Sequence, residues 1–175
     1  MDYVVKEVQD FYKIIKLKSF RHTEGVSFDV MVKSMLPQID AIDRVIHKKS
    51  ALSPGVINNV SRPWYMHPYQ EDTLLVLQGT REIELYSPKY GGIEQFVFTP
   101  NYIEQNGEKL LEGGGFITWN ANVFHRIRSG KEGSTSINLA TQHGGFDIET
   151  NFNIYDLNIE TGEYRLLREG YKDQK

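Results

Sequence analysis

The chain has 175 residues, of which 20 are basic and 23 acidic, and its formal net charge is −3. Charges of both signs are spread along the sequence, so no basic surface for nucleic acid is expected. The chain has no cysteine, which excludes disulfides, iron–sulfur clusters, thiolate zinc sites and cysteine nucleophiles.

Length and hydropathy favour one folded domain. A chain of this length buries roughly 70% of the surface that its unfolded form exposes, which is enough for one sizeable core. No stretch approaches the ~18 to 20 consecutive apolar residues of a membrane span. The first residues, which include Asp2, Lys6 and Glu7, lack the apolar core of a signal peptide. We therefore expect a cytoplasmic protein without a membrane partner.

The first predicted element is a short amphipathic helix. Val4, Val8, Phe11 and Ile15 recur at intervals of four, three and four residues, which places them on one side of a helix. A helix this short is marginal in water without tertiary contacts. We expect it to pack on the main sheet or on a partner subunit.

Strands are expected next. Apolar residues occupy every second position from Val26 to Val32, which predicts a strand with one buried face. Pro37 breaks this pattern. Residues 42–47 can form another strand, which the turn signal Ser53-Pro54-Gly55 ends.

After residue 72, short apolar runs alternate with turn signals at close intervals. Asn106-Gly107 is typical of a hairpin tip and Gly113-Gly114-Gly115 of a tight corner. A mainly all-β sandwich or barrel is the economical architecture. The runs predict short strands at 73–77, 83–85, 96–98, 116–119, 125–128, 136–140, 152–157 and 164–167.

Two short segments carry the residues with the clearest chemistry. The first runs from Tyr65 through His67 to Asp72, and the second runs from Gly114 to His125. Each places a histidine beside a turn and a strand. Imidazole and carboxylate groups from neighbouring strands are the usual ligands of zinc, iron, manganese or nickel, so the pattern indicates a metal site without naming a reaction.

Together these segments resemble the paired motifs of the cupin superfamily. In the first motif of that family, two histidines are followed by an acidic residue and a glycine; in the second, a glycine and a Pro-x-Gly turn precede a histidine. Here Asp72 lies five residues after His67 and seven before Gly79, and Gly114 lies eleven before His125.

The chain departs from the family pattern at two places. Tyr65 stands where the first histidine is expected, and Asn120-Ala-Asn122 stands where the Pro-x-Gly turn is expected. Asn122 can still adopt a left-handed backbone, though less easily than glycine. The resemblance covers roughly residues 42 to 145.

The resemblance implies a cupin-type jelly-roll β-barrel. We place the barrel at residues 42–169, with the N-terminal helix and a strand at 1–41 and a frayed polar tail at 170–175. By analogy with the family, the protein is expected to be a homodimer.

The resemblance also implies that His67, Asp72 and His125 point into the barrel mouth, with Tyr65 completing the set. Two histidines and one carboxylate form a facial triad that leaves metal positions open for water, oxygen or substrate. The implied cofactor is a divalent metal ion, Fe, Mn, Ni or Zn.

Two alternatives to this ligand set stay open. In a shifted register, Tyr69 replaces a histidine and Glu71 is the acidic residue. In the other alternative the barrel has lost its metal, and His67 and His125 form hydrogen bonds with Asp72 and with tyrosines in a polar pocket.

Aromatic residues surround the first histidine. Trp64, Tyr65 and Tyr69 flank His67 and are our candidates for contacts to a small organic ligand; the alternative is that they only fill the core. Arg126 and Arg128 are expected on the outer face, because strand alternation turns them away from His125.

Three other histidines and one polar loop complete the candidates. His22, His47 and His143 have no partner of matching spacing and are expected to be surface or satisfied residues. Residues 142–153 form either a polar loop over the barrel mouth or a solvated connection, and the latter is favoured.

Three functions are compatible with this sequence. The first is a metal-dependent enzyme, either an oxygenase or an isomerase, that acts on a small substrate. The second is a non-catalytic protein that binds a small molecule. The third is an assembly module with a degenerate, metal-free site, in which the N-terminal helix and strand pair with a second copy.

Overall fold

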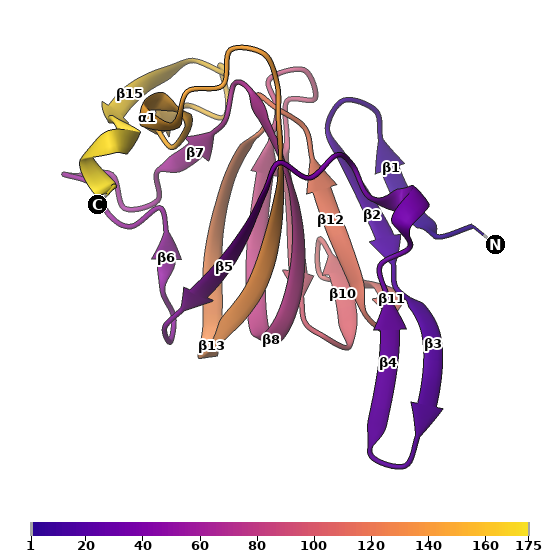
Figure 1. Cartoon of the computed structure of the whole chain (residues 1–175). Coiled ribbons are helices and arrows are strands. Elements are labelled where there is room, and N and C mark those ends of the chain that lie inside the picture. The colour runs from indigo at the N-terminus through magenta and orange to yellow at the C-terminus, as the bar shows by residue number, and fades with distance from the viewer. Residues whose placement is uncertain (1, 175) are drawn as a thin grey trace.

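The computed structural model describes residues 2–174 and is mainly β, as predicted (Figure 1). Two long antiparallel strands, β8 (Gln70–Tyr86) and β13 (Phe124–Gln142), lie at the centre of a 13-stranded sheet. They pair along most of their length, and the register shifts near Gly79 and between Ser129 and Ser134. Such bulges bend a strand pair, so each long strand contributes one half to each of two layers.

The first layer contains the first half of β8 and the second half of β13. Its other strands, in order outward from β8, are β12 (Gly115–Trp119), β2 (Tyr12–Lys16) and β1 (Val4–Val8), and β5 (Ala41–His47) pairs with β13.

The second layer contains the other halves of the two long strands. On the side of β8 lie β9 (Ile93–Phe98), β10 (Tyr102–Gln105) and β11 (Glu108–Glu112). On the side of β13 lie β6 (Leu52–Ser53), β7 (Trp64–Met66), β14 (Ile154–Leu157) and β15 (Tyr164–Arg168).

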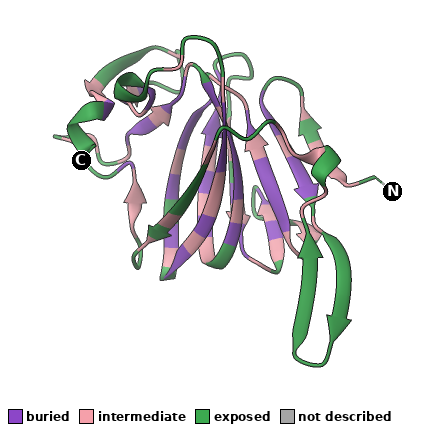
Figure 2. Ribbon diagram, viewed as in Figure 1, coloured by how far each residue is buried: buried purple, intermediate pink, exposed green. Residues whose placement is uncertain are grey.

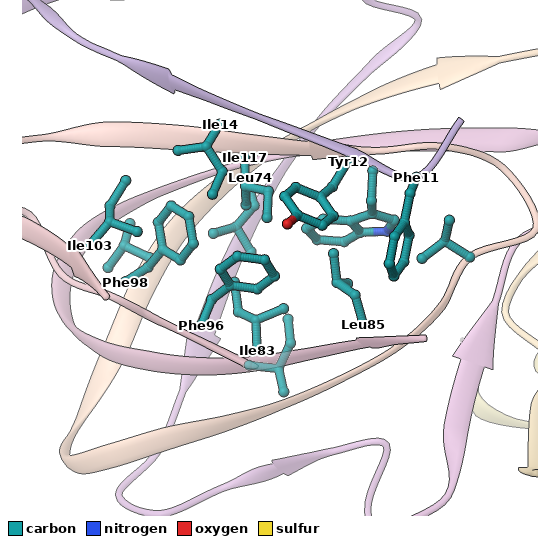
Figure 3. Packing of buried hydrophobic residues seen from close by; sticks show 14 residues of the cluster. Phe11, Tyr12, Ile14, Leu74, Ile83, Leu85, Phe96, Phe98, Ile103 and Ile117 are labelled. Atoms are coloured by element: carbon teal, nitrogen blue, oxygen red, sulfur yellow. The ribbon is translucent and has the colours of Figure 1, made fainter. Parts of the chain in front are cut away.

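The main core fills the space between the layers (Figure 3). Ile14, Leu74 and Ile117 come from the first layer and face Ile83 and Phe96 of the second, and all five are at most 1% exposed. Burying an aliphatic or aromatic side chain of this size contributes roughly 1.5–3 kcal/mol. The core therefore holds the two layers at a fixed spacing, which is the condition for a rigid site between them.

The predicted N-terminal helix is wrong. Val4 and Val8 lie in β1, Ile15 lies in β2, and the two strands form a hairpin. Asp10 has a φ of 59° in the connecting turn, where the amide of Phe11 donates to Val8 O. The helical spacing was coincidental: the segment is rich in β-branched residues, which favour strands, and β2 gains ladder bonds from β12.

The strand predicted at 26–32 is present as β4 (Val26–Val30), but its predicted buried face is wrong. It pairs only with β3 (Lys18–Thr23) in a separate two-stranded sheet, and every residue of both strands is exposed. Figure 2 shows this hairpin in green, extending away from the barrel. We call it the arm. A 3₁₀ turn, Lys33–Met35, leads from it to β5.

The strand predicted at 42–47 is confirmed as β5. The prediction of uniformly short strands after residue 72 is wrong, because the runs at 73–77 and 83–85 are both parts of β8, and those at 125–128 and 136–140 are both parts of β13. Gly79 does not end a strand. It has a φ of +72°, and a Cβ there would lie 2.0 Å from Gly133 O, so glycine allows β8 to continue through the bulge.

The turn predictions are confirmed at two places. Asn106 and Gly107 connect β10 to β11 with φ angles of 51° and 84°, and Asn122 has the left-handed φ of 64° that the second motif requires. The predicted fraying of the tail is wrong for Gly170–Asp173, which form a 3₁₀ turn. Gly170 is buried, and Arg168 pairs with Asp173 at 2.6 Å; Lys175 lies outside the described residues.

Among residues 2–174, no helix is long and apolar enough to cross a membrane. The one α-helix in this range, α1 (Ile148–Asn151), is a single turn with Asp147 as its N-cap.

Candidate functional site

The two sequence motifs meet where the layers face each other beside β7. His67 follows β7 directly, and its carbonyl oxygen accepts a hydrogen bond from the amide of Asn122 at 2.8 Å. His125 lies in β13, opposite Tyr65 of β7 and Leu85 of β8. Asp72 lies in β8, opposite Trp119 of β12. Backbone pairing therefore brings the three predicted ligands together from three strands or strand ends.

His67, Asp72 and His125 form one compact cluster. One donor atom of each lies within 4.8 Å of the others, and the three residues are only 4%, 4% and 5% exposed. His67 Nε2 lies 3.4 Å from Asp72 Oδ2, and the two imidazole rings are 4.7 Å apart between centroids. The cluster predicted from sequence is thus assembled in the structure.

Backbone carbonyls orient both imidazoles. Nδ1 of His67 bonds to Asn151 O, and Nδ1 of His125 bonds to Val123 O at 3.2 Å. A carbonyl oxygen only accepts, so each Nδ1 carries a proton, and in the neutral tautomer of each ring Nε2 is the nitrogen with the free lone pair. This is the arrangement that metal-binding histidines usually have.

Two amide side chains hold the carboxylate. Gln70 Nε2 donates to Asp72 Oδ1 at 2.8 Å, and Gln70 Oε1 accepts from Asn151 Nδ2 at 3.1 Å. The indole N–H of Trp119 lies close enough to favour the charged carboxylate slightly, although no hydrogen bond of normal geometry joins them. Asp72 is therefore fixed by groups that cannot neutralise its charge.

Burial shifts the pKa values of two cluster members. Loss of hydration raises the pKa of the Asp72 carboxyl, and His67 and Gln70 oppose that rise. Burial, reinforced by His67, lowers the pKa of His125 well below its ordinary value. At neutral pH His125 is therefore an uncharged imidazole with a free lone pair, which is the form that binds metal or accepts a proton.

A cavity of about 280 Å³ opens beside the cluster. Tyr65 borders it, with its ring 6.2 Å from that of His67 and 5.9 Å from that of His125. Burial is the main cause that raises the pKa of the Tyr65 phenol, so the hydroxyl stays protonated at neutral pH. The other lining residues are Asp43, Val45, His47, Ser53, Gln70, Arg81, Trp119, Ile127, Asn138 and Phe152.

Trp64 and Tyr69, the other two aromatic residues predicted to contact an organic ligand, do not line this cavity. Trp64 is 2% exposed and packs under the Arg126 guanidinium, 4.0 Å from the ring centroid. Tyr69 is 46% exposed and lies against Gly145. Of the three aromatic candidates, Tyr65 is the one that lines the cavity.

The shifted register is not what the structure adopts. Glu71 pairs with His143 at 3.0 Å, away from the histidine cluster, whereas Asp72 faces His67. Period-two alternation in β8 explains this difference, because adjacent residues of a strand point to opposite faces.

A larger hollow, of about 510 Å³, lies on the outer face of the second layer. Its arginines are already paired: Arg62 and Arg126 with Glu84, and Arg128 with Glu82. The expectation that Arg126 and Arg128 face outward is confirmed. This hollow contains none of the histidines, so its size does not make it the candidate site.

The donor set of the cluster fits a divalent cation. Two Nε2 atoms and one carboxylate converge, and each of the three side chains is oriented by a hydrogen bond from its far side. A metal ion held by these three residues would offset the cost of burying that carboxylate.

Sequence reasoning missed several residues of the site. The loop at 142–153 was expected to be a solvated connection, but Asn151 is 2% exposed and holds both His67 and Gln70. Phe152 packs edge-on against His67 at 5.0 Å. His47 was expected to be a surface or satisfied residue, yet it borders the cavity with a buried, unpartnered Nδ1. Burial was the missing signal in each case.

The fold of this chain is shared with solved structures, although no protein-family model and no curated protein matches the sequence. It is similar to QdtA, a sugar 3,4-ketoisomerase from Thermoanaerobacterium thermosaccharolyticum in complex with TDP, with 15% identity, a TM-score of 0.53 and coverage of 80% of this chain and 85% of that one.

Two further structures are similar. A dTDP sugar isomerase from Desulfovibrio desulfuricans G20 has 13% identity, a TM-score of 0.56 and coverage of 80% of both chains. The rmlC epimerase of Mycobacterium tuberculosis has 10% identity, a TM-score of 0.54 and coverage of 78% of this chain and 66% of that one. At these identities the likeness concerns the fold, and it confirms the predicted cupin-type jelly-roll barrel.

Proposed function

We propose that this protein is a metal-dependent isomerase of a small hydroxy-carbonyl compound. The observation that carries the proposal is the convergence of His67 Nε2, His125 Nε2 and the Asp72 carboxylate beside a cavity. The isomerase class, rather than the oxygenase class, is favoured by the fold shared with sugar isomerases and an epimerase.

A bound divalent ion would polarise a carbonyl or hydroxyl oxygen of the substrate. Residues of the chain would carry out the proton transfers, and Asp43, a carboxylate that lines the cavity, would accept the proton that leaves carbon. When His67, Asp72 and His125 serve as ligands, Tyr65 borders the cavity with a protonated phenol hydroxyl that can donate a proton at neutral pH. Gln70 and Asn151 keep the ligands in place, and Phe152 covers His67 and keeps water from one side.

The size of the cavity limits the substrate. At about 280 Å³ it lies just below the ~300–1,000 Å³ of ordinary ligand pockets. A single sugar ring or a short hydroxy-carbonyl chain fits that volume, and a nucleotide attached to the sugar would have to lie outside.

Proton exchange tests the proposal on a panel of candidate substrates. An isomerase removes a proton from a carbon beside a carbonyl group, so in D₂O it labels that carbon. We expect NMR to detect deuterium uptake by one member of a panel of aldoses, ketoses, sugar phosphates, hydroxy acids and TDP-linked keto-sugars, and no uptake with the His125→Ala variant. Saturable binding without exchange, for every compound that binds, would instead identify a non-catalytic binding protein.

A second candidate is a metal-free acid–base isomerase, which the His67–Asp72 contact of 3.4 Å favours. In that case the His125 imidazole, uncharged at neutral pH, accepts the proton from carbon and Tyr65 donates one to oxygen. Deuterium exchange that survives complete removal of metal would support this candidate over the first.

We further propose that the protein is a homodimer in the cytoplasm and that the arm makes the dimer contact. A two-stranded hairpin is marginally stable by itself in water, and the arm exposes Phe20, Val26 and Phe28 by 69%, 47% and 48%. A second copy of the chain could cover these side chains and continue the unpaired edges of the arm.

A further inference from the structure

Arg81 is a buried cation without an acidic partner. It lies in β8 just after the bulge and is 1% exposed. Its guanidinium donates from Nε to Ser134 Oγ at 3.1 Å and from Nη2 to Val45 O at 3.2 Å. Neither acceptor carries a charge, and no carboxylate of the described residues forms an ion pair with it. Fully buried arginines are rare unless they are paired.

The guanidinium retains donors for a ligand. It has five N–H groups in a planar fork, of which the two bonds above use one on Nε and one on Nη2. Burial lowers the pKa of Arg81 to about 10, so it remains charged at neutral pH. A buried positive charge with free N–H groups at a cavity wall is a built receptor for an oxyanion.

A second unpartnered group lies at the same end of the cavity. His47 Nδ1 is buried and has no hydrogen-bond partner, and His47 lies opposite Ser134, the residue that accepts from Arg81, in the pairing of β5 with β13. Burial and the nearby charge of Arg81 lower the pKa of His47 to about 4. The imidazole is therefore uncharged at neutral pH and can donate one N–H to an anion.

The cavity thus has two different ends. Asp43 lies on β5 near the metal-binding end and raises the pKa of Asp72, whereas Arg81 and His47 lie at the other end. The length of the cavity follows from the strand pairing. Val45, whose carbonyl accepts from Arg81, lies four residues along β5 from Ala41. Ala41 pairs with Ala140 of β13, and Ala140 pairs with Asp72 of β8. At ~3.3 Å per residue this is at most about 13 Å, the length of a short extended molecule.

We propose that Arg81, assisted by His47, binds a terminal carboxylate or phosphate of the substrate and so selects an anionic hydroxy-carbonyl compound, such as a sugar acid or a sugar phosphate. The inference rests on the proposed function for the reactive end of the substrate. The anion site itself needs no metal and no turnover, so it can be tested separately.

Anion titrations test this site. Inorganic phosphate and acetate, with glucose as a neutral probe, are titrated at constant ionic strength into the purified protein, followed by thermal denaturation and by calorimetry. We expect saturable stabilisation by at least one anion, none by glucose, and no response to that anion in Arg81→Gln. The anion that binds more tightly distinguishes a phosphate from a carboxylate ligand.

Two further variants serve as controls, one for the loss of any arginine and one for the loss of the guanidinium geometry alone. Arg128→Gln removes an exposed arginine of the outer face and should leave the anion affinity unchanged, because Arg128 pairs with Glu82. Arg81→Lys keeps the charge but loses the planar fork, so we expect affinity about tenfold weaker; this variant decides the matter if Arg81→Gln does not fold. Equal anion affinity in the wild type and in Arg81→Lys or Arg81→Gln would overturn the inference, as would an equal loss in Arg128→Gln.

The same titration in chelator-treated protein and in His125→Ala separates this inference from the proposed function. Retained anion binding there, lost on substitution of Arg81, supports the anion site even if no metal or exchange activity is found. Anion binding that disappears with the metal would place the anion on the metal and overturn the role of Arg81.

Discussion

Two backbone carbonyls determine what the histidines of the site can do. Because Asn151 O and Val123 O engage Nδ1 of His67 and His125, the Nε2 atoms of both rings face Asp72 and the cavity. The resemblance of the two motifs to the cupin family was sufficient to predict that His67, Asp72 and His125 lie together, and their binding of a metal stays a prediction. The resemblance could not predict Asn151, Gln70 or Arg81, because the contacts of Asn151 with His67 and Gln70, and that of Arg81 with Ser134, join segments far apart in the chain.

Tyr65 tests the division of roles within the cavity. Since Tyr65 borders the cavity without belonging to the ligand cluster, Tyr65→Phe should keep its metal and lose turnover by roughly 10²–10⁴-fold, as expected for a proton-transfer group. Metal content and deuterium exchange are measured on the same sample. Tyr69→Phe, which changes an exposed tyrosine, is the matched control; a Tyr65→Phe variant that exchanges as fast as the wild type would refute the assigned role.

His47 predicts how stability depends on pH. Its pKa in the folded protein is lowered from 6.5 to about 4, so between these values the unfolded chain binds a proton that the folded one does not. The free energy of unfolding should therefore fall as the pH drops from about 6.5 to about 4. We expect His47→Gln to reduce this fall, measured as urea midpoints across that range.

His22→Gln is the control for the pH experiment, because His22 is exposed on the arm. It should follow the wild-type curve. If His47→Gln loses as much stability on acidification as the wild type does, another buried group, such as His125, accounts for the pH dependence.

At the scale of elements, the N-terminal region shows where pattern reasoning failed. The helical spacing of Val4, Val8, Phe11 and Ile15 was outweighed by ladder bonds from β2 to β12, which no local pattern reveals. As a consequence, this N-terminal hairpin is part of the core: Phe11, Ile14 and Ile15 are at most 1% exposed. Removal of residues 1–20 would therefore damage the core, and it cannot serve as a test of assembly alone.

The arm allows a cleaner test of assembly. Its residues are exposed throughout, so replacing residues 18–30 by a short Gly/Ser linker should shift the midpoint of thermal unfolding by no more than about 2–4 °C, the effect of about 1 kcal/mol in a domain of this size. Sedimentation should change from dimer to monomer.

A point-variant pair supports that experiment. Phe20→Ser combined with Phe28→Ser should also weaken the dimer, whereas Ile148→Ser, at a residue 50% exposed on α1, should not. A dimer that persists without the arm would exclude the arm as the contact.

At the scale of the whole molecule, the mainly β class was predictable because short apolar runs alternate with turn signals. The barrel was predictable because the two motifs occur in the expected order. The long strands were not, because Gly79 resembles a strand end in sequence but forms a bulge with Gly133 against it. That bulge bends β8 so that Asp72 lies in one layer and Leu85, opposite His125, in the other. The site is thus a product of the bend in the central strand pair.

The most direct test of the central claim is elemental analysis of the purified, untagged protein, with His67→Ala and His125→Ala in parallel. We expect near-stoichiometric iron, manganese, nickel or zinc in the wild type and its loss in both variants, each of which should remain folded by circular dichroism. A wild-type protein that holds none of these metals, even after incubation with each of them, would contradict the metal centre.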